Sequence, residues 1–240
     1  MAEQDAPEKR GRLSRPLVLG AAVALVDREG LAALTMRRLA AELGVESMAL
    51  YRYTPGKEAL LDGLVEAYFD EINARLRAGA GRGAHEGGWR AELRRIAQAF
   101  AATAHAHPEI LPLIATRPLS VPVARRPASV LELTEHILAV LGRAGFDDAG
   151  ALTVYRTFVA WNLGCLLVDK RQVVDNPNEP DPVLRLGLHR LPAAEYPRLR
   201  ALVPRFADFD DEAELLSGLD SLLDRMPGPP LDGFYGSDAS

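Results

Sequence analysis

Residues 35–57, TMRRLAAELGVESMALYRYTPGK, contain two short helix-forming segments that meet at a glycine. Thr35 is suited to cap the first helix, because its hydroxyl can accept an unpaired backbone N–H of the first turn. Apolar residues then recur at helical spacing as far as Leu43. Gly44 is suited to the left-handed conformation in which helices often end, and residues 55–56, Pro-Gly, stop the second segment. The pattern predicts a helix-turn-helix, although an ordinary helical hairpin inside an all-α domain has the same apolar spacing.

The second helix of this motif is cationic and aromatic on the surface that it leaves uncovered. In DNA-binding helix-turn-helix domains the second helix lies in the major groove, while the first crosses the phosphate backbone. We expect Arg37 to reach a guanine edge or a phosphate. Ser47, Met48, Arg52 and Tyr53 are expected to face the groove, and Thr35, Tyr51 and Lys57 to touch phosphates. The candidate DNA-binding residues are Thr35, Arg37, Arg38, Ser47, Met48, Ala49, Tyr51, Arg52, Tyr53 and Lys57.

The distribution of charge agrees with this interpretation. Over the whole chain, 28 Lys and Arg oppose 33 Asp and Glu, a formal net charge of −5 that alone argues against a nucleic-acid binder. From Lys9 to Lys57, however, nine cations accompany four anions, a local charge of +5. Phosphate contacts from Lys and Arg supply most non-specific affinity, so a local basic face is sufficient. A solvated surface helix is the alternative explanation of such a cluster.

Length and composition permit one DNA-binding module and one larger domain with its own core. The chain has 240 residues, of which 48% are hydrophobic. No apolar run approaches the roughly 20 residues of a membrane helix, and the charged N-terminus lacks the apolar core of a signal peptide. We therefore expect a cytoplasmic protein with no membrane partner. The single cysteine, Cys165, excludes an internal disulfide and is interpreted as a small buried hydrophobe.

Helical patterns continue through the rest of the chain, and no alternating strand is found. The expected organisation is a flexible basic arm at 1–14, a helix-turn-helix domain at 15–62, a ligand-binding and dimerisation domain at 63–226 and a loose tail at 227–240. Expected helices after the motif cover 57–76, 89–107, 128–143, 147–171, 193–206 and 211–226, with a short apolar turn at 110–116 and a proline-rich connection at 172–192.

The N-terminal region resembles the DNA-binding domain of the tetracycline-repressor (TetR) family. The resemblance begins at Leu17 in LVLGAAVALVDREGLAALTMRRLAAELGV and continues through LYRYTPGKEALLDGL. The usual aromatic-His or aromatic-Phe step after the LY pair is here Arg52 and Tyr53, which alters base preference rather than class. The resemblance implies a homodimer that binds double-stranded operator DNA. It also implies a four-helix dimer bundle, here from helices 147–171 and 211–226, and a small-molecule effector that changes the separation of the two DNA-binding heads.

The C-terminal region is similar to the ligand-binding domain of the same family in three fragments, ATRP at 115–118, AGF at 144–146 and NLGCLLVDK at 162–170. In the tetracycline repressor, a histidine and a glutamate take part in binding the Mg²⁺–drug complex, and here the matching positions are Leu113 and Val168. Neither side chain offers the oxygen that Mg²⁺ prefers, so a Mg²⁺-dependent effector is not expected. The candidate ligand-binding residues outline a mainly apolar site with a few polar anchors: Phe100, Thr103, Leu113, Thr116, Thr134, Ile137, Tyr155, Val159 and Asn162.

Catalytic and metal-binding signals are weak. His105 and His107 are two residues apart on an expected helix, so they point in different directions and do not chelate one metal ion. No P-loop, G-x-S-x-G or dinucleotide motif is present, and we expect neither a cofactor nor a metal nor an enzymatic activity. The sequence predicts an all-α, dimeric, ligand-responsive regulator, a repressor that a largely apolar effector releases from a palindromic operator. The alternative is a helical ligand-binding or protein-interaction protein whose helix-turn-helix is only structural.

Overall fold

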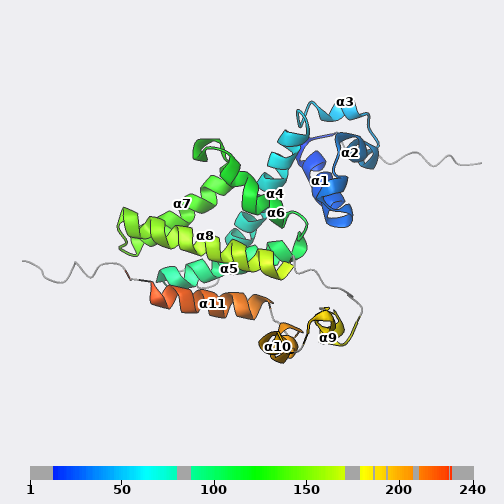
Figure 1. Cartoon of the computed structure of the whole chain (residues 1–240). Helices are drawn as coiled ribbons and strands as arrows, with labels where there is room; N and C mark the ends of the chain where they lie inside the picture. The colour runs from blue at the N-terminus through cyan, green and yellow to red at the C-terminus, as the bar shows by residue number, and fades with distance from the viewer. Residues whose placement is uncertain are drawn as a thin grey trace, which may run out of the picture. The chain divides into compact units, whose positions relative to one another are not determined.

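The computed structural model describes residues 13–79, 88–170, 179–185, 187–192, 194–207, 211–226 and 228. Within these ranges the regular secondary structure is entirely helical, which confirms the all-α prediction (Figure 1). The α-helices are α1 (Arg15–Glu29), α2 (Met36–Leu43), α3 (Ser47–Leu50), α4 (Lys57–Gly79), α5 (Gly88–Ala106), α6 (Leu111–Thr116), α7 (Ala128–Arg143), α8 (Asp148–Lys170), α9 (Pro182–Arg185), α10 (Pro197–Ala207) and α11 (Asp211–Arg225). Short 3-10 helices are η1 (Leu31–Ala33), η2 (Arg117–Ser120), η3 (Val123–Arg125) and η4 (Leu188–Arg190).

Contacts within the chain divide it into two compact units. Unit 1 comprises Met1–Asn73 and His107–Leu131, and unit 2 comprises Ala74–Ala106 and Glu132–Ser240. The predicted arm lies outside the described residues except for its last two positions, and the predicted tail lies outside them except for Gly228.

The two ends of α1, the first helix of unit 1, are set by a capping serine and a terminal glycine. The Ser14 hydroxyl accepts a hydrogen bond from the Leu17 N–H at 3.4 Å, and Pro16 occupies the first turn, where its missing N–H is not needed. Gly30 ends α1 with φ 80°, and its N–H donates to the Val26 carbonyl at 2.7 Å. A positive φ of this kind favours glycine.

The core of unit 1 forms where α1 and the helices after it bury their leucines. At Gly63 on α4, a Cβ would lie 2.3 Å from the Leu19 side chain of α1, so any larger residue requires the end of Leu19 to shift. The leucines that lose all solvent contact in this core are Leu25, Leu34, Leu39, Leu50, Leu60 and Leu64. These residues fix α1, α2, α3 and the start of α4 as one structure (Figure 1).

The core of unit 2 is built on α5, α8 and α11, which pack pairwise against one another. Trp89 of α5 meets Phe146 edge to face, with ring centroids 5.1 Å apart, so α5 and α8 begin at the same end of the unit. Figure 1 shows the two helices running side by side from that end. On α11, a Cβ at Gly218 would lie 2.3 Å from the Trp161 ring, which shows how closely α8 and α11 approach.

Two expectations about unit 2 need correction. Asp148–Val168 of α8 is 21 residues long with a mean hydropathy of 1.4, which is long and apolar enough to cross a membrane by length and composition. The prediction that no apolar segment approaches the length of a membrane helix was therefore wrong. Cys165, expected to be a buried hydrophobe, is partly exposed on α8.

Candidate DNA-binding surface and effector site

The turn between α2 and α3 has the geometry that the sequence predicts. The Thr35 hydroxyl accepts from the Arg38 N–H at 3.0 Å and caps α2. Gly44 ends α2 in the left-handed conformation, φ 64° and ψ 37°, and Val45 N–H donates back to the Ala40 carbonyl at 3.0 Å. Paired hydrogen bonds of this type satisfy the last carbonyls of a helix. The turn therefore fixes the direction in which α3 leaves α2.

The regular part of the second helix is shorter than predicted. Helix α3 covers four residues, Ser47–Leu50, and the chain then turns, with Tyr53 N–H and Thr54 N–H both donating to the Leu50 carbonyl. Leu50 and Thr54 are buried against the rest of unit 1, which orients the opposite surface outward. Met48 is 76% exposed and Tyr51 is 45% exposed, so two large apolar side chains lie on this outward surface.

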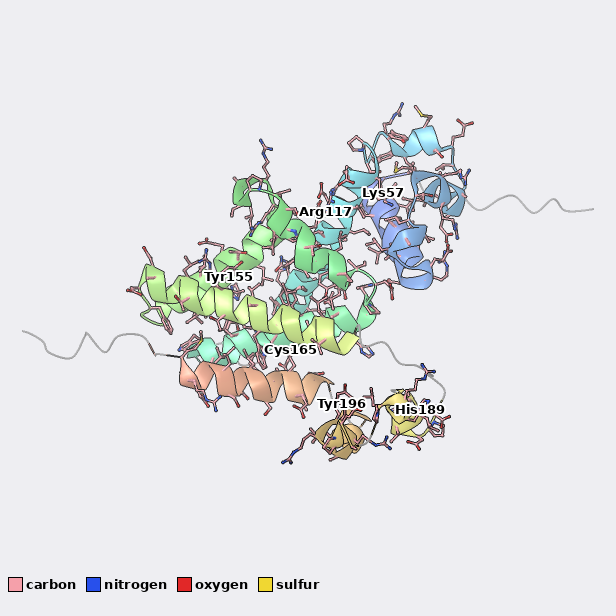
Figure 2. The ribbon with its side chains drawn as sticks, viewed as in Figure 1. Lys57, Arg117, Tyr155, Cys165, His189 and Tyr196 are labelled. Carbon is pink, nitrogen blue, oxygen red and sulfur yellow. The ribbon has the colours of Figure 1, made fainter. Side chains whose placement is uncertain are left out.

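The cations of unit 1 fall into two groups. Arg37, Arg52 and Lys57 are exposed, and Lys57 begins α4 beside α3 (Figure 2). Arg38 instead donates to Glu29 Oε1 at 2.5 Å and to Glu42 Oε2 at 2.9 Å, and these hydrogen bonds raise the pKa of its guanidinium. The charge of Arg38 is therefore balanced by two glutamates within unit 1, so the exposed cations Arg37, Arg52 and Lys57 are better placed to bind phosphate.

Two ion-pair networks in unit 1 were not foreseen from the sequence. Arg117 donates to Asp62 Oδ1 at 2.6 Å and to Glu58 Oε2 at 2.9 Å, which raises the pKa of the guanidinium and ties η2 to the first turns of α4. His107 lies between two carboxylates, with Nδ1 2.8 Å from Asp27 and Nε2 2.9 Å from Glu71.

No local signal in the sequence could have found these partners. Asp27 and His107 are 80 residues apart, and Asp62 and Arg117 are 55 residues apart. The expectation had placed His107 on a helix, whereas α5 ends at Ala106 and the imidazole joins α1 to α4.

The candidate ligand-binding residues are divided between the units. Leu113 and Thr116 lie in unit 1 on α6, where Leu113 is buried. Thr116 is exposed, and its hydroxyl donates to the Pro112 carbonyl at 3.0 Å. The other candidates lie in unit 2, namely Phe100 and Thr103 on α5, Thr134 and Ile137 on α7, and Tyr155, Val159 and Asn162 on α8.

The polar members of the unit 2 group differ in their hydrogen bonding. Thr134 Oγ1 lies 3.2 Å from the Tyr155 hydroxyl, which links α7 to α8 (Figure 2). Thr103 is fully buried and Asn162 is 2% exposed, yet Thr103 Oγ1 and Asn162 Oδ1 have no hydrogen-bond partner. The apolar candidates Phe100 and Ile137 are also buried.

The buried carboxylate of Glu92 connects α5 and α7 in unit 2. Glu92 accepts from Arg95 Nη2 at 2.6 Å and pairs with His136 Nε2 at 2.5 Å. Burial alone would raise the pKa of Glu92, but the hydrogen bonds from Arg95 and His136 outweigh it and lower the pKa. The carboxylate is therefore held in its charged form.

Two open grooves lie on helices of unit 2, away from the predicted ligand residues. One, of about 600 Å³, is lined by α11 and by Arg94 of α5, which pairs with Asp220. The other, of about 510 Å³, is lined by Arg156, Thr157, Ala160, Trp161 and Leu222 of α8 and α11. Among the described residues, no group of three or more His, Cys, Asp or Glu side chains could hold a metal ion.

Comparison with known proteins supports the family resemblance of both the N-terminal and the C-terminal region. Residues 18–64 match "Bacterial regulatory proteins, tetR family", and residues 83–226 match "Tetracyclin repressor-like, C-terminal domain". The transcriptional repressor DrrR1 of Streptomyces coeruleorubidus is 38% identical over 131 residues, 55% of this chain and 44% of that protein. A transcriptional regulator of Saccharopolyspora erythraea is 30% identical over 203 residues, 82% of this chain and 80% of that protein.

The fold agrees as well. A possible TetR family regulator from Streptomyces coelicolor superposes with a TM-score of 0.71 and 28% identity, covering 88% of this chain and 97% of that one. The N-terminal match contains the capped helix α2, the left-handed glycine turn and the exposed helix α3. The C-terminal match contains the larger helical core. The chain belongs to the tetR family of bacterial regulatory proteins and is a transcriptional regulator.

Proposed function

We propose that the protein is a homodimeric repressor that binds a palindromic operator through α3 and is released by a small, largely apolar effector. The observation that carries the DNA-binding part is the outward face of α3, where exposed Met48 and Tyr51 accompany exposed Arg52. Met48 and Tyr51 are three residues apart on one helical face, and adjoining exposed apolar side chains mark interaction surfaces more often than single ones do. A short helix with a mixed apolar and cationic face suits insertion into a major groove.

Within that proposal, the groove is faced by Ser47, Met48, Ala49, Arg52 and Tyr53. Arg37 contacts a guanine or a phosphate, and phosphates are contacted by Thr35, Tyr51 and Lys57. Arg38 contributes less, because Glu29 and Glu42 already pair with it. A gel-shift series with the DNA upstream of the chain's own gene, at low and high salt, tests this. Affinity should fall steeply as salt rises, because phosphate contacts release counterions.

Variants separate DNA recognition from a merely structural motif. Arg52→Ala should weaken operator binding by about 1–3 kcal/mol if Arg52 contacts a base. Arg143→Ala, an exposed arginine at the end of α7, is the matched control and should leave binding unchanged. Salt-insensitive binding, or equal behaviour of the two variants, would show that the helix-turn-helix is only a scaffold.

The dimer is proposed from the surface of α8. Only 28% of the apolar window Asp148–Val168 is buried within the chain, and Leu152 and Val168 on it are exposed. The adjoining groove of about 510 Å³ between α8 and α11 can receive side chains of a second copy. A two-fold bundle of this kind would cover the apolar surface and present two copies of α3 about one DNA turn, roughly 34 Å, apart. This assembly accounts for the apolar character of α8 in a protein that acts on DNA in the cytoplasm.

The effector is proposed to bind without Mg²⁺. Leu113 is a buried hydrocarbon side chain and Val168 is exposed, and neither provides an oxygen ligand. A thermal-shift screen against tetracycline and apolar compounds, each with and without EDTA, tests this. Stabilisation that disappears on chelation would contradict the proposal, as would stabilisation that leaves operator affinity unchanged, because an effector must bind the two states unequally.

A further inference from the structure

Thr103 differs from the other threonines of the described helices, each of which has a hydrogen-bond partner. In the described helices, hydroxyls commonly donate to the carbonyl four residues earlier, as Thr116 does to Pro112 at 3.0 Å and Thr157 does to Thr153 at 2.9 Å. Thr153 follows the same pattern with Ala149. Thr103 is fully buried and makes no such bond. A buried hydroxyl without a partner costs about 1–3 kcal/mol, so this orientation needs an explanation.

Thr103 lies on a defined face of α5. It follows Trp89 by fourteen residues, four turns of helix, with Ile96 midway between them on the same face. Trp89 contacts Phe146 immediately before α8, so this face of α5 is the one directed toward the start of α8. The Thr103 hydroxyl is therefore at the far end of the same face.

Asn162 occupies the matching level on α8. It lies fourteen residues beyond Asp148, where α8 begins, in a buried stripe that includes Val154, Phe158 and Leu166. Helices α5 and α8 pack together from a shared end, so Thr103 and Asn162 are at about the same height along the pair. Asn162 Oδ1 is also buried without a partner.

Other buried polar atoms do not share this arrangement. Trp161 Nε1 is unpartnered too, but its ring packs on Gly218 of α11. The Tyr68 hydroxyl and Arg126 Nε are also unpartnered, but both lie in unit 1, and burial raises the pKa of Tyr68. Thr103 and Asn162 are thus two unpartnered oxygens, in one unit, on two packed helices and at one level.

We propose that Thr103 and Asn162 are the polar anchors of the effector site, and that they select a neutral, largely apolar molecule with a hydroxyl or N–H donor. This inference rests on the proposed effector-binding function. An amide oxygen only accepts hydrogen bonds, so the ligand must donate to Asn162 Oδ1, whereas the Thr103 hydroxyl can donate or accept. An anion would place like partial charges together in an apolar interior. Because both oxygens are shielded from solvent, a ligand reaches them by moving α5 and α8 apart, which couples binding to a rearrangement of the unit.

The first test needs no ligand. Thr103→Val removes the hydroxyl at nearly constant volume and should raise the Tm of the ligand-free protein by about 2–4 °C, because an unsatisfied buried group is lost. Thr103→Ser keeps the hydroxyl and should not raise it. Thr153→Val, whose hydroxyl is bonded to the Ala149 carbonyl, is the matched control and should show no increase. A lower Tm for Thr103→Val would show that the hydroxyl already has a partner, such as a buried water, and would overturn the proposal.

The second test uses three probes of one shape, measured by calorimetry on the full chain: 2-naphthol, naphthalene and 2-naphthoate. The wild type should bind 2-naphthol about tenfold or more tightly than naphthalene, and 2-naphthoate most weakly. The advantage of 2-naphthol should disappear in Asn162→Leu and fall in Thr103→Val. Equal affinities, no binding of 2-naphthol, or an unchanged preference in both variants would overturn the assignment. A gel shift of the ligand-free protein reports separately on DNA binding, so failure of the proposed repressor function is distinguishable from failure of these anchors.

Discussion

Single glycines set how closely the helices of this protein approach. At Gly218 a Cβ would lie 2.3 Å from Trp161, and at Gly63 one would lie 2.3 Å from Leu19. Gly142 on α7 is also helical, but no atom lies within 4 Å of the position of its Cβ. Gly218 is therefore required by packing against an indole ring, Gly63 lies against the flexible end of a leucine, and Gly142 only adds backbone freedom.

This contrast predicts opposite effects of one substitution. Gly218→Ala should lower the free energy of unfolding by about 1–3 kcal/mol, because the methyl group overlaps a rigid indole ring. Gly142→Ala should raise it by about 0.5–1 kcal/mol, since alanine is the better helix former. Urea unfolding followed by circular dichroism measures both. A stabilising Gly218→Ala would mean that Trp161 is free to move away from α11.

At the scale of elements, charged side chains hold helices together over long separations in sequence. Glu92 joins α5 to α7 through His136, and His107 joins α1 to α4 through Asp27 and Glu71. The Glu92 side chain is 10% exposed and that of His107 is 17% exposed, so solvent screens these contacts less than it screens surface ion pairs. Removing either contact should therefore lower the free energy of unfolding by a measurable amount.

For Glu92, the expected effect depends on pH. Its folded-state pKa lies below the ordinary carboxyl value of 4.5, so its stabilisation is fully present above pH 4.5 and is lost as pH falls through the folded-state pKa. Glu92→Gln should be less stable than the wild type above pH 4.5, and the difference should shrink on acidification. Urea unfolding across that range measures it, with Glu135→Gln, an exposed carboxylate on α7, as the control. A difference that does not vary with pH would contradict the assignment.

For His107, removal of the imidazole should release two hydrogen bonds at once. His107→Ala leaves Asp27 and Glu71 without this partner and should lower the free energy of unfolding by about 1–3 kcal/mol. His189→Ala, an exposed histidine of η4, should change stability little. Differential scanning calorimetry compares them, and equal shifts would argue that the imidazole contributes nothing to unit 1.

At the scale of the whole molecule, the proposed dimer depends on the uncovered surface of α8. Val168 on α8 and Leu119 on η2 are both 72% exposed in the single chain, which makes them a matched pair. Val168→Glu should shift the protein toward the monomer, because a carboxylate would be buried at the interface, and Leu119→Glu should leave the dimer intact. Size-exclusion chromatography with light scattering measures this. A monomeric wild type at micromolar concentration would remove the basis of the dimer.

The sequence by itself determined the local features. Thr35 caps α2, Gly44 ends it, and α7 has the predicted bounds of 128–143, because caps, turn conformations and helical periodicity act within a few residues. The sequence predicted a longer second helix than the four residues of α3, because the chain turns after Leu50, which is fixed by packing within unit 1.

Only the tertiary structure decided which polar groups have partners. Thr103 and Thr116 are the same residue type on helices that are consecutive in the sequence, yet Thr116 bonds its own helix and Thr103 is buried with an unpartnered hydroxyl. Arg38 and Arg52 are both cations of the motif, yet acidic side chains from α1 and α2 pair with Arg38 while Arg52 stays exposed. Hydrogen bonding and charge pairing depend on atoms brought together from distant positions, and the spacing of residues along the chain does not encode those distances.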